Sequence, residues 1–262
     1  MKITQIRNAT IVIEFAHGKM IVDPMLARQS KLPKLRYFKS DKRNPLVDLP
    51  TCFSRIAEEI DFALITHCQK GHFDHLDRAG VRWLAQRQIP TFCTSRDNGY
   101  LQKKQIETKV LADKHNAFFD GSIQLIPATH TRGWLTPFME HGTGYYIALR
   151  DEPSVYLMGD TVLTDTIRSF IRETQPDYIV APTGKAQFDI GAPLLLDESE
   201  ILELSELSTG TIICNHMEAL DHCRISRSDL RCLLDNSGVA HRYRIPHDGE
   251  TMELSLSQLA LE

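Results

Sequence analysis

Short apolar runs separated by polar turns make up most of the chain. Runs that are rich in Val, Ile, Phe and Tyr predict buried β-strands. They lie at residues 2–7, 10–15, 19–22, 62–65, 91–94, 108–111, 116–120, 122–128, 145–149, 154–158, 178–181, 211–214 and 239–246. The first three runs are close enough together to predict a hairpin or meander.

Segments with apolar residues at helical spacing lie between many of these runs. Asp77 is a good N-cap for a helix that reaches about Gln88, with Val81 and Leu84 on its inward face. Further helices are predicted at 54–60, 96–103, 163–173, 197–207 and 227–236. Strands followed by helices occur in both halves of the chain, and this pattern favours an α/β fold.

Length and composition are those of an ordinary globular protein. The chain has 262 residues, of which 42% are hydrophobic and 24% are charged, so we expect a single domain over residues 1–262. The net charge of -4 gives no support to bulk nucleic-acid binding. Charged residues interrupt the apolar pattern from Lys2 onward, so we expect neither a membrane span nor a targeting signal. Six cysteines without a C-x-x-C pair predict reduced thiols in a cytoplasmic protein.

One long segment, residues 26–45, lacks any periodicity and is called the basic loop below. It contains seven Lys and Arg residues and a single acid, Asp41. A run of charges is usually a solvated surface. A loop of this length in a compact domain is more often functional or disordered than incidental, so a lid that attracts an anionic substrate is the second interpretation.

Candidate metal ligands are concentrated where the run 62–65 ends. His67, His72, Asp74 and His75 follow within nine residues. In an extended or turning segment, His72 and Asp74 point the same way while His75 points elsewhere, so one loop can serve two neighbouring metal positions. Imidazole and carboxylate suit zinc, iron, manganese or nickel, and the lack of a thiolate pair argues against a closed structural zinc site. A loop that only satisfies its own backbone groups is the alternative.

Three later strands also end at residues that can bind a metal. His130, Asp160 and His216 each follow a predicted strand at the same kind of position as His67. Asp160 could instead cap the helix that follows it, although Thr161 or Thr164 could take that role.

These residues carry a family resemblance. The run His72-Phe73-Asp74-His75-Leu76-Asp77, preceded by Thr66-His67, resembles the His-X-His-X-Asp-His signature of the metallo-β-lactamase-fold hydrolases. The resemblance implies an αββα sandwich, a four-layer α/β (α+β) fold in which two mixed β-sheets carry helices on their outer faces. Within this superfamily the chain looks most like the branch that includes ascorbate-6-phosphate lactonase and the N-acyl-phosphatidylethanolamine phospholipase D-like enzymes.

The motif departs from the family in one spacing. The family separates its first two histidines by one residue, whereas Cys68-Gln69-Lys70-Gly71 separates His67 from His72 here. Either three residues are inserted and His67 is the first ligand, or Lys70 stands at that position. We favour His67, because it follows the strand directly and because a lysine ammonium has no lone pair for a metal.

The resemblance implies two divalent cations, with zinc as the first candidate and manganese as the second. His141 is a weaker competitor for the position of His130, and Asp23 is a candidate for supporting the metal loop rather than for binding metal. The implied ligands are His67, His72 and His130 for one metal, and Asp74, His75 and His216 for the other, with Asp160 bridging the two. A metal-bound water or hydroxide would then attack the substrate.

Four residues are candidates for catalysis or substrate binding. His222 is a candidate general acid, or else it braces its loop, and Asp74 would orient the attacking water if only one metal is bound. Lys185 and Gln187 follow the strand 178–181 and are the candidate substrate contacts, with solvation as the other assignment for Lys185.

The sequence therefore predicts a metal-dependent hydrolase of a small anionic ester, either a lactone or a phosphodiester. One alternative is a binding protein that keeps the fold without a working metal site, and the irregular spacing before His72 keeps this alternative open. A nuclease is the other, although the net acidity of the chain counts against it. A homo-oligomer is compatible with all of these.

Overall fold

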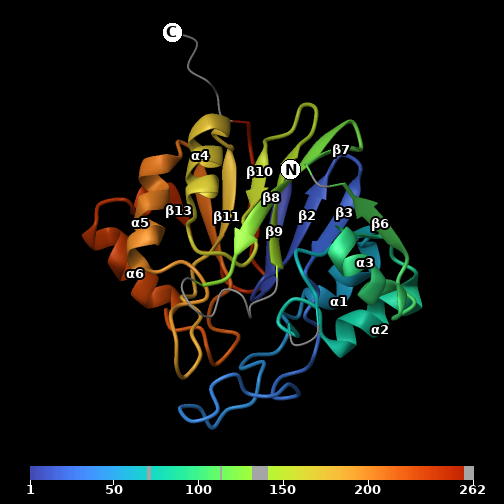
Figure 1. Cartoon of the computed structure of the whole chain (residues 1–262), viewed down its shortest axis with the longest axis horizontal. Helices are drawn as coiled ribbons and strands as arrows, with labels where there is room; N and C mark the ends of the chain where they lie inside the picture. The colour runs from blue at the N-terminus through green and yellow to red at the C-terminus, as the bar shows by residue number, and fades with distance from the viewer. Residues whose placement is uncertain (70–71, 113, 132–140, 257–262) are drawn as a thin grey trace.

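Two β-sheets pack face to face and carry helices on their outer surfaces (Figure 1). The structure is a computed structural model, and it describes residues 1–69, 72–112, 114–131 and 141–256. Over these residues each sheet has seven strands. This arrangement confirms the sandwich of two mixed sheets that the sequence predicts.

The first sheet is built mainly from the N-terminal part of the chain. Its strand order is β14-β1-β2-β3-β4-β5-β6. The strands are β1 (Lys2–Arg7), β2 (Thr10–Phe15), β3 (Gly18–Val22), β4 (Phe62–Leu64), β5 (Thr91–Thr94), β6 (Thr108–Leu111) and β14 (Thr251–Glu253). Neighbours are antiparallel from β14 to β3 and parallel from β3 to β6.

The second sheet has the same mixture of directions. Its strand order is β13-β12-β11-β10-β9-β8-β7. The strands are β7 (His115–Phe118), β8 (Gly121–Thr129), β9 (His141–Ala148), β10 (Val155–Leu157), β11 (Tyr178–Pro182), β12 (Thr211–Asn215) and β13 (Tyr243–Arg244). Neighbours are antiparallel from β7 to β10 and parallel from β10 to β13.

Three apolar layers hold the sandwich together. The central layer lies between the sheets and takes residues from both, among them Ile13, Leu64, Ile147 and Val180. The outer layers lie under the helices, at Leu84 and its neighbours on one side and around Ile167, Ile201 and Leu230 on the other. The helices are α1 (Phe53–Ile56), α2 (Arg78–Arg87) and α3 (Ser95–Gln102) on the first sheet, and α4 (Asp165–Thr174), α5 (Glu198–Leu207) and α6 (Arg227–Asn236) on the second (Figure 1).

The helix caps decide one question that the sequence leaves open. Asp77 caps α2 by accepting from Gly80 N, as predicted. Thr164 caps α4 by accepting a hydrogen bond of 3.3 Å from Ile167 N. Asp160 is therefore not needed as a cap.

Two predicted strands differ in the structure. Residues 239–246 form a one-turn 3-10 helix at Ala240–Arg242 before the short β13, so His241 is exposed on a helical turn and not on a strand. β9 begins at His141 rather than near Tyr145. Its glycines suggest a turn in the sequence, but a Cβ at Gly144 would lie 2.9 Å from Met158 O, so a glycine is needed there for close packing in the strand.

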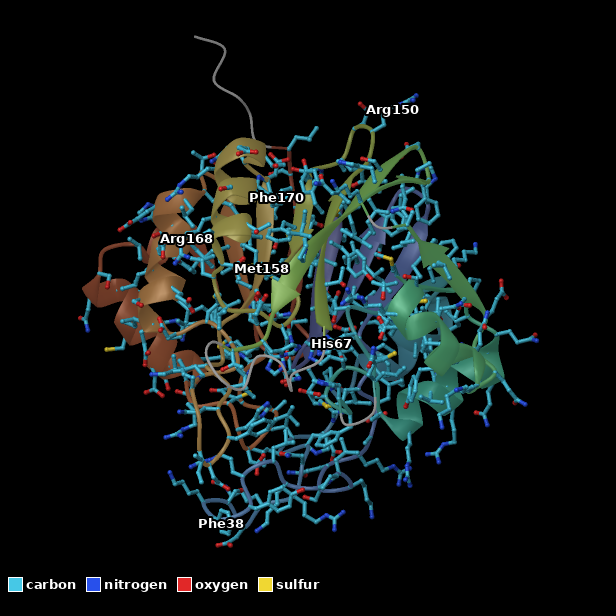
Figure 2. All side chains as sticks on the ribbon, viewed as in Figure 1. Phe38, His67, Arg150, Met158, Arg168 and Phe170 are labelled. Carbon is cyan, nitrogen blue, oxygen red and sulfur yellow. The ribbon has the colours of Figure 1, made fainter. Side chains whose placement is uncertain are left out.

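The fold brings the ends of several distant strands to one edge. β4, β8, β10 and β12 all run toward this edge, and His67 is seen there where the two halves of the sandwich meet (Figure 2). The basic loop extends beyond the same edge, with Phe38 far out on it (Figure 2). In the described part of the chain, every helix is too short or too polar to cross a lipid bilayer.

Candidate metal centre

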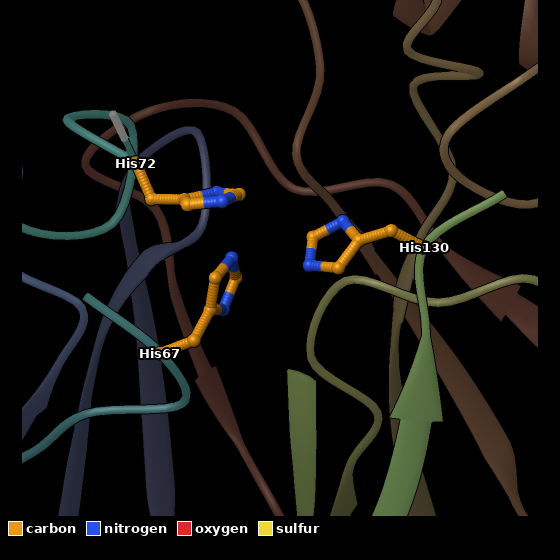
Figure 3. A group of neighbouring side chains, drawn as sticks. All are labelled: His67, His72 and His130. Carbon is orange, nitrogen blue, oxygen red and sulfur yellow. The ribbon is translucent and has the colours of Figure 1, made fainter. Parts of the chain in front are cut away.

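Three histidines from two separate elements form the first cluster. One ring nitrogen from each of His67, His72 and His130 lies within 4.8 Å of the corresponding nitrogens of the other two. The ring centroids of His67 are 4.7 Å from His72 and 4.8 Å from His130. His67 and His72 come from the loop after β4 and His130 from the end of β8, and all three rings point into a shared space (Figure 3). Lys70, the alternative to His67, lies outside the described residues.

The second cluster contains two carboxylates and two imidazoles. Ligand atoms of Asp74, His75, Asp160 and His216 lie within 4.8 Å of one another. Asp160 Oδ2 is 3.0 Å from His75 Nε2 and 3.5 Å from His216 Nε2. Asp74 Oδ2 is 3.9 Å from the same two nitrogens. The structure therefore brings together all seven residues for which metal binding is predicted, in the two groups expected.

The donor atoms fit divalent cations. His67 Nε2 and His130 Nε2 are buried and form no hydrogen bond with any described residue. A buried polar atom without a partner costs about 1–3 kcal/mol, so such atoms are rare unless something else binds them. Imidazole nitrogens and carboxylate oxygens are the donors that zinc and manganese share.

The protonation of these groups also suits metal binding. Burial lowers the pKa of His67 well below its usual value and the pKa of His130 to about 4, so both rings are neutral near pH 7 and keep a free lone pair. Burial alone would raise the pKa of Asp160, but His216 and His75 outweigh it and hold this pKa well below its usual value. Asp160 is therefore an anion facing both clusters.

Two residues that the sequence analysis did not select hold the loops of the site in place. Asn8 O accepts a hydrogen bond of 3.0 Å from His216 N, and Asn8 Nδ2 donates to Asp74 O over 3.3 Å. Asp97 on α3 accepts from Cys68 N over 3.2 Å and from Thr94 Oγ1 over 2.7 Å. The sequence around Asn8 indicates only a turn between two strands, and Asn8 does adopt the positive φ of 55° that is typical of a turn.

A chamber opens onto both clusters and has an otherwise apolar lining. It has a volume of about 630 Å³, part of it open to solvent, and is lined by His72, Asp74, His130, Asp160 and His222, together with Leu35, Ala186, Phe188 and Leu194. The ring of His222 stacks on Phe188, with centroids 6.2 Å apart and planes 21° apart. The described part of this lining contains no Lys or Arg.

The two predicted substrate contacts have other partners. Lys185 Nζ forms an ion pair of 2.5 Å with Glu198, and Gln187 Nε2 donates to Gly191 O over 2.7 Å. Neither side chain is among the described residues that line the chamber. Both instead hold the loop that follows β11.

The basic loop is fastened to the segment that carries His222. Asp221 accepts hydrogen bonds from Leu35 N over 3.1 Å and from Asn44 Nδ2 over 2.8 Å. Asp189 accepts from Phe38 N over 2.8 Å. Leu35 is the residue of the basic loop that lines the chamber, and the Lys and Arg side chains of the loop are not part of this lining.

Comparison with known proteins gives consistent matches over most of the chain. The family described as "Beta-lactamase superfamily domain" matches residues 22–205. The chain is 32% identical over 257 residues to the UPF0173 protein YddR of Bacillus subtilis, covering 96% of this chain and 99% of that protein. An isothiocyanate hydrolase from Delia radicum gut bacteria superposes with a TM-score of 0.87 at 29% identity, covering 97% of this chain and 99% of the other. A possible metal-dependent hydrolase from Veillonella parvula superposes with a TM-score of 0.88 at 25% identity, covering 97% of this chain and 99% of the other.

Proposed function

Since this chain belongs to the beta-lactamase superfamily domain family, we propose that it hydrolyses a small substrate at an electrophilic carbon or phosphorus atom inside the chamber. It is a metal-dependent hydrolase of the metallo-β-lactamase fold. The observation that carries the proposal is the meeting of two ligand clusters, the second of which contains Asp160, on the wall of one chamber.

The proposed ligands are divided between two cations. We assign His67, His72 and His130 to one, and Asp74, His75 and His216 to the other, with Asp160 offering an oxygen to both. When bound, a pair of divalent cations would supply Lewis acidity and would lower the pKa of a bound water toward neutrality. Zinc is the first candidate and manganese the second, because both accept this mixture of donors.

We assign His222 to substrate binding rather than to general acid catalysis. Burial lowers the pKa of His222 to about 4, so the ring is neutral near pH 7 and seldom carries a proton to give away. Its Nδ1 is buried and has no hydrogen-bond partner among the described residues. Stacking on Phe188 fixes the plane of the ring, so a neutral imidazole can orient a polar atom of the substrate in the chamber.

The substrate predicted from the sequence is an anionic lactone or phosphodiester. The chamber has room for a small substrate, but its described lining offers no Lys or Arg to pair with an anionic group. An isothiocyanate is a second candidate. It is favoured by the apolar wall and by the 29% identity to the isothiocyanate hydrolase over 97% of this chain.

The test is a hydrolysis panel with metal-loaded protein. The probes are a γ-lactone, bis-p-nitrophenyl phosphate, benzyl isothiocyanate and a single-stranded oligonucleotide, and H216A is the control for contaminating activity. We expect turnover of one small-molecule class that is lost in H216A and after chelation and returns when zinc or manganese is added. Turnover of the oligonucleotide alone would favour a nuclease. Less than one metal per chain together with no turnover would favour a binding protein.

A further inference from the structure

A second concave surface, the basic groove, lies beside the candidate metal centre. Five cationic side chains line it: Lys31 and Arg43 from the basic loop, Arg78 and Arg82 from α2, and Lys104 just after α3. The basic groove encloses about 1930 Å³, part of it open to solvent, and meets the chamber at His72. We propose that it binds an amphipathic organic anion, with a phosphate or carboxylate group on an acyl or aryl body.

Among the described residues, the cations of the basic groove have no acidic partners. None of its five cations forms an ion pair with a described residue. Asp77 is the acid among the described lining residues; it is buried, and its two oxygens accept from Gly80 N and Ala27 N. The chain as a whole has a net charge of -4, so the local excess of cations is not a by-product of a basic protein.

Helix stability does not explain the two arginines of α2. Arg78 is the first residue of this helix, where the helix dipole opposes a cation. Arg82 lies one turn later on the same side, and like charges at this spacing repel. By contrast, Arg87 at the other end of α2 is paired with Glu58. An anion bound between Arg78 and Arg82 would remove both unfavourable interactions.

The rest of the lining is apolar, so the ligand must have an apolar part as well. Phe73, Leu76, Val81 and Tyr100 line the basic groove between its cations. Lys104 Nζ lies 5.6 Å from the centre of the Tyr100 ring, so a cation and an aromatic side chain are neighbours in the lining. A hydrocarbon or aryl body can cover these side chains while its anionic group pairs with an arginine.

The test uses metal-free protein, so it does not depend on the hydrolase proposal. Octyl phosphate and octanoate are titrated into the protein by calorimetry. Octyl glucoside, which has an octyl group and no charge, is the neutral probe. We expect saturable binding of the anions that weakens as salt is added, and little binding of the glucoside. Octyl phosphate should bind the double variant R82E/K104E roughly tenfold or more weakly. R172E/R231E, which changes the charge by the same amount at exposed residues of α4 and α6, should bind like the natural chain.

Several outcomes would overturn the proposal. Equal affinity for octyl phosphate and octyl glucoside, or unchanged affinity in R82E/K104E, would exclude a role for the cations. Displacement of octyl phosphate by an oligonucleotide that binds more tightly would assign the basic groove to nucleic acid. Self-association that R82E/K104E abolishes would assign it to a second copy of this chain. R78Q/R82Q, which removes charge without reversing it, and thermal melts of every variant separate loss of binding from loss of folding.

Discussion

Asp23 and His75 are joined by a buried hydrogen bond behind the candidate metal centre, in which His75 Nδ1 donates to Asp23 Oδ2 over 2.8 Å. The other nitrogen, His75 Nε2, thereby faces the second cluster, 3.0 Å from Asp160 Oδ2. Asp23 also accepts from Thr66 N over 2.8 Å, so one carboxylate fixes the ring and the loop that carries it. A carboxylate behind a metal-binding imidazole sets its tautomer and raises its basicity.

Replacing Asp23 by Asn should weaken metal binding without removing any proposed ligand. Asn keeps a hydrogen-bond acceptor and loses the charge, so we expect metal affinity to fall by about 10- to 100-fold. Competition with a fluorescent chelator measures this affinity. D61N changes an exposed carboxylate that accepts from Lys19 N, and its affinity should match that of the natural chain. Equal affinities for D23N and D61N would contradict the role of Asp23.

The bridging position proposed for Asp160 is tested by counting metals. If Asp160 holds two cations together, D160A should lose one metal per chain, because the second cluster keeps fewer donors and the repulsion between the cations is no longer offset. Metal analysis by mass spectrometry gives the stoichiometry. D165A removes an exposed carboxylate on α4 and should leave it unchanged. An unchanged metal content in D160A would favour a single-metal site.

The candidate metal ligands could be selected from the sequence because strand ends are local features. His67, His130 and His216 each follow an apolar run, and the fold places these run ends at one edge. The unusual stretch before His72 could not be interpreted from the sequence. Cys68 N is held by Asp97, which lies 29 positions further along the chain and is buried in the first turn of α3.

The orientation of the two predicted substrate contacts could not be predicted from the sequence, because it depends on residues further along the chain. Lys185 and Gln187 lie at the correct edge of the sheet, but their orientation depends on partners that the local sequence does not identify. Glu198 lies 13 residues after Lys185 and takes its ammonium away from the chamber. Phe188, an apolar residue of the same loop, lines the chamber instead. Strand-end position thus predicts which loop forms a site, and long-range pairing decides which of its side chains face it.

The metal-free protein should lose stability in weak acid. Burial lowers the pKa of both His130 and His222 to about 4 from the usual 6.5. As pH falls from about 6.5 to about 4, the unfolded chain takes up these protons first, so the free energy of unfolding falls by up to about 1.4 kcal/mol per pH unit for each group. His75, whose pKa is raised well above its usual value, loses its contribution only at higher pH.

Urea unfolding of chelator-treated protein between about pH 4 and pH 7 measures this dependence. H222Q removes one of the groups with a lowered pKa and should have a shallower slope. Bound metal competes with protons for the imidazoles, so the metal-loaded protein should keep its stability to lower pH. A metal-free protein whose stability is flat across this range would show that these rings are not buried in the neutral form.

Asp221 should control how firmly the basic loop is closed over the chamber. D221A removes the acceptor for Leu35 N and Asn44 Nδ2, and its side chain is buried, so both donors lose their partner. We expect faster tryptic cleavage within the basic loop and a several-fold higher KM, since Leu35 lines the chamber. D235A, an exposed position on α6, is the matched control. Equal cleavage rates in the two variants would show that other contacts hold the loop.

A single methyl group at Gly184 should disturb the second cluster through the backbone. A Cβ there would lie 1.9 Å from His216 O, much closer than any side-chain atom can approach, so the strand end that carries His216 must move. We expect G184A to lower the free energy of unfolding by about 1–3 kcal/mol and to weaken metal binding as well. A Cβ at Gly99 on α3 would meet no neighbouring atom within 4 Å, so G99A should keep metal affinity and gain about 0.5–1 kcal/mol from better helix propensity. Urea unfolding and metal titration of the two variants make the comparison. If G184A were as stable as G99A and bound metal equally well, the close approach of Gly184 to His216 would not be what positions this histidine.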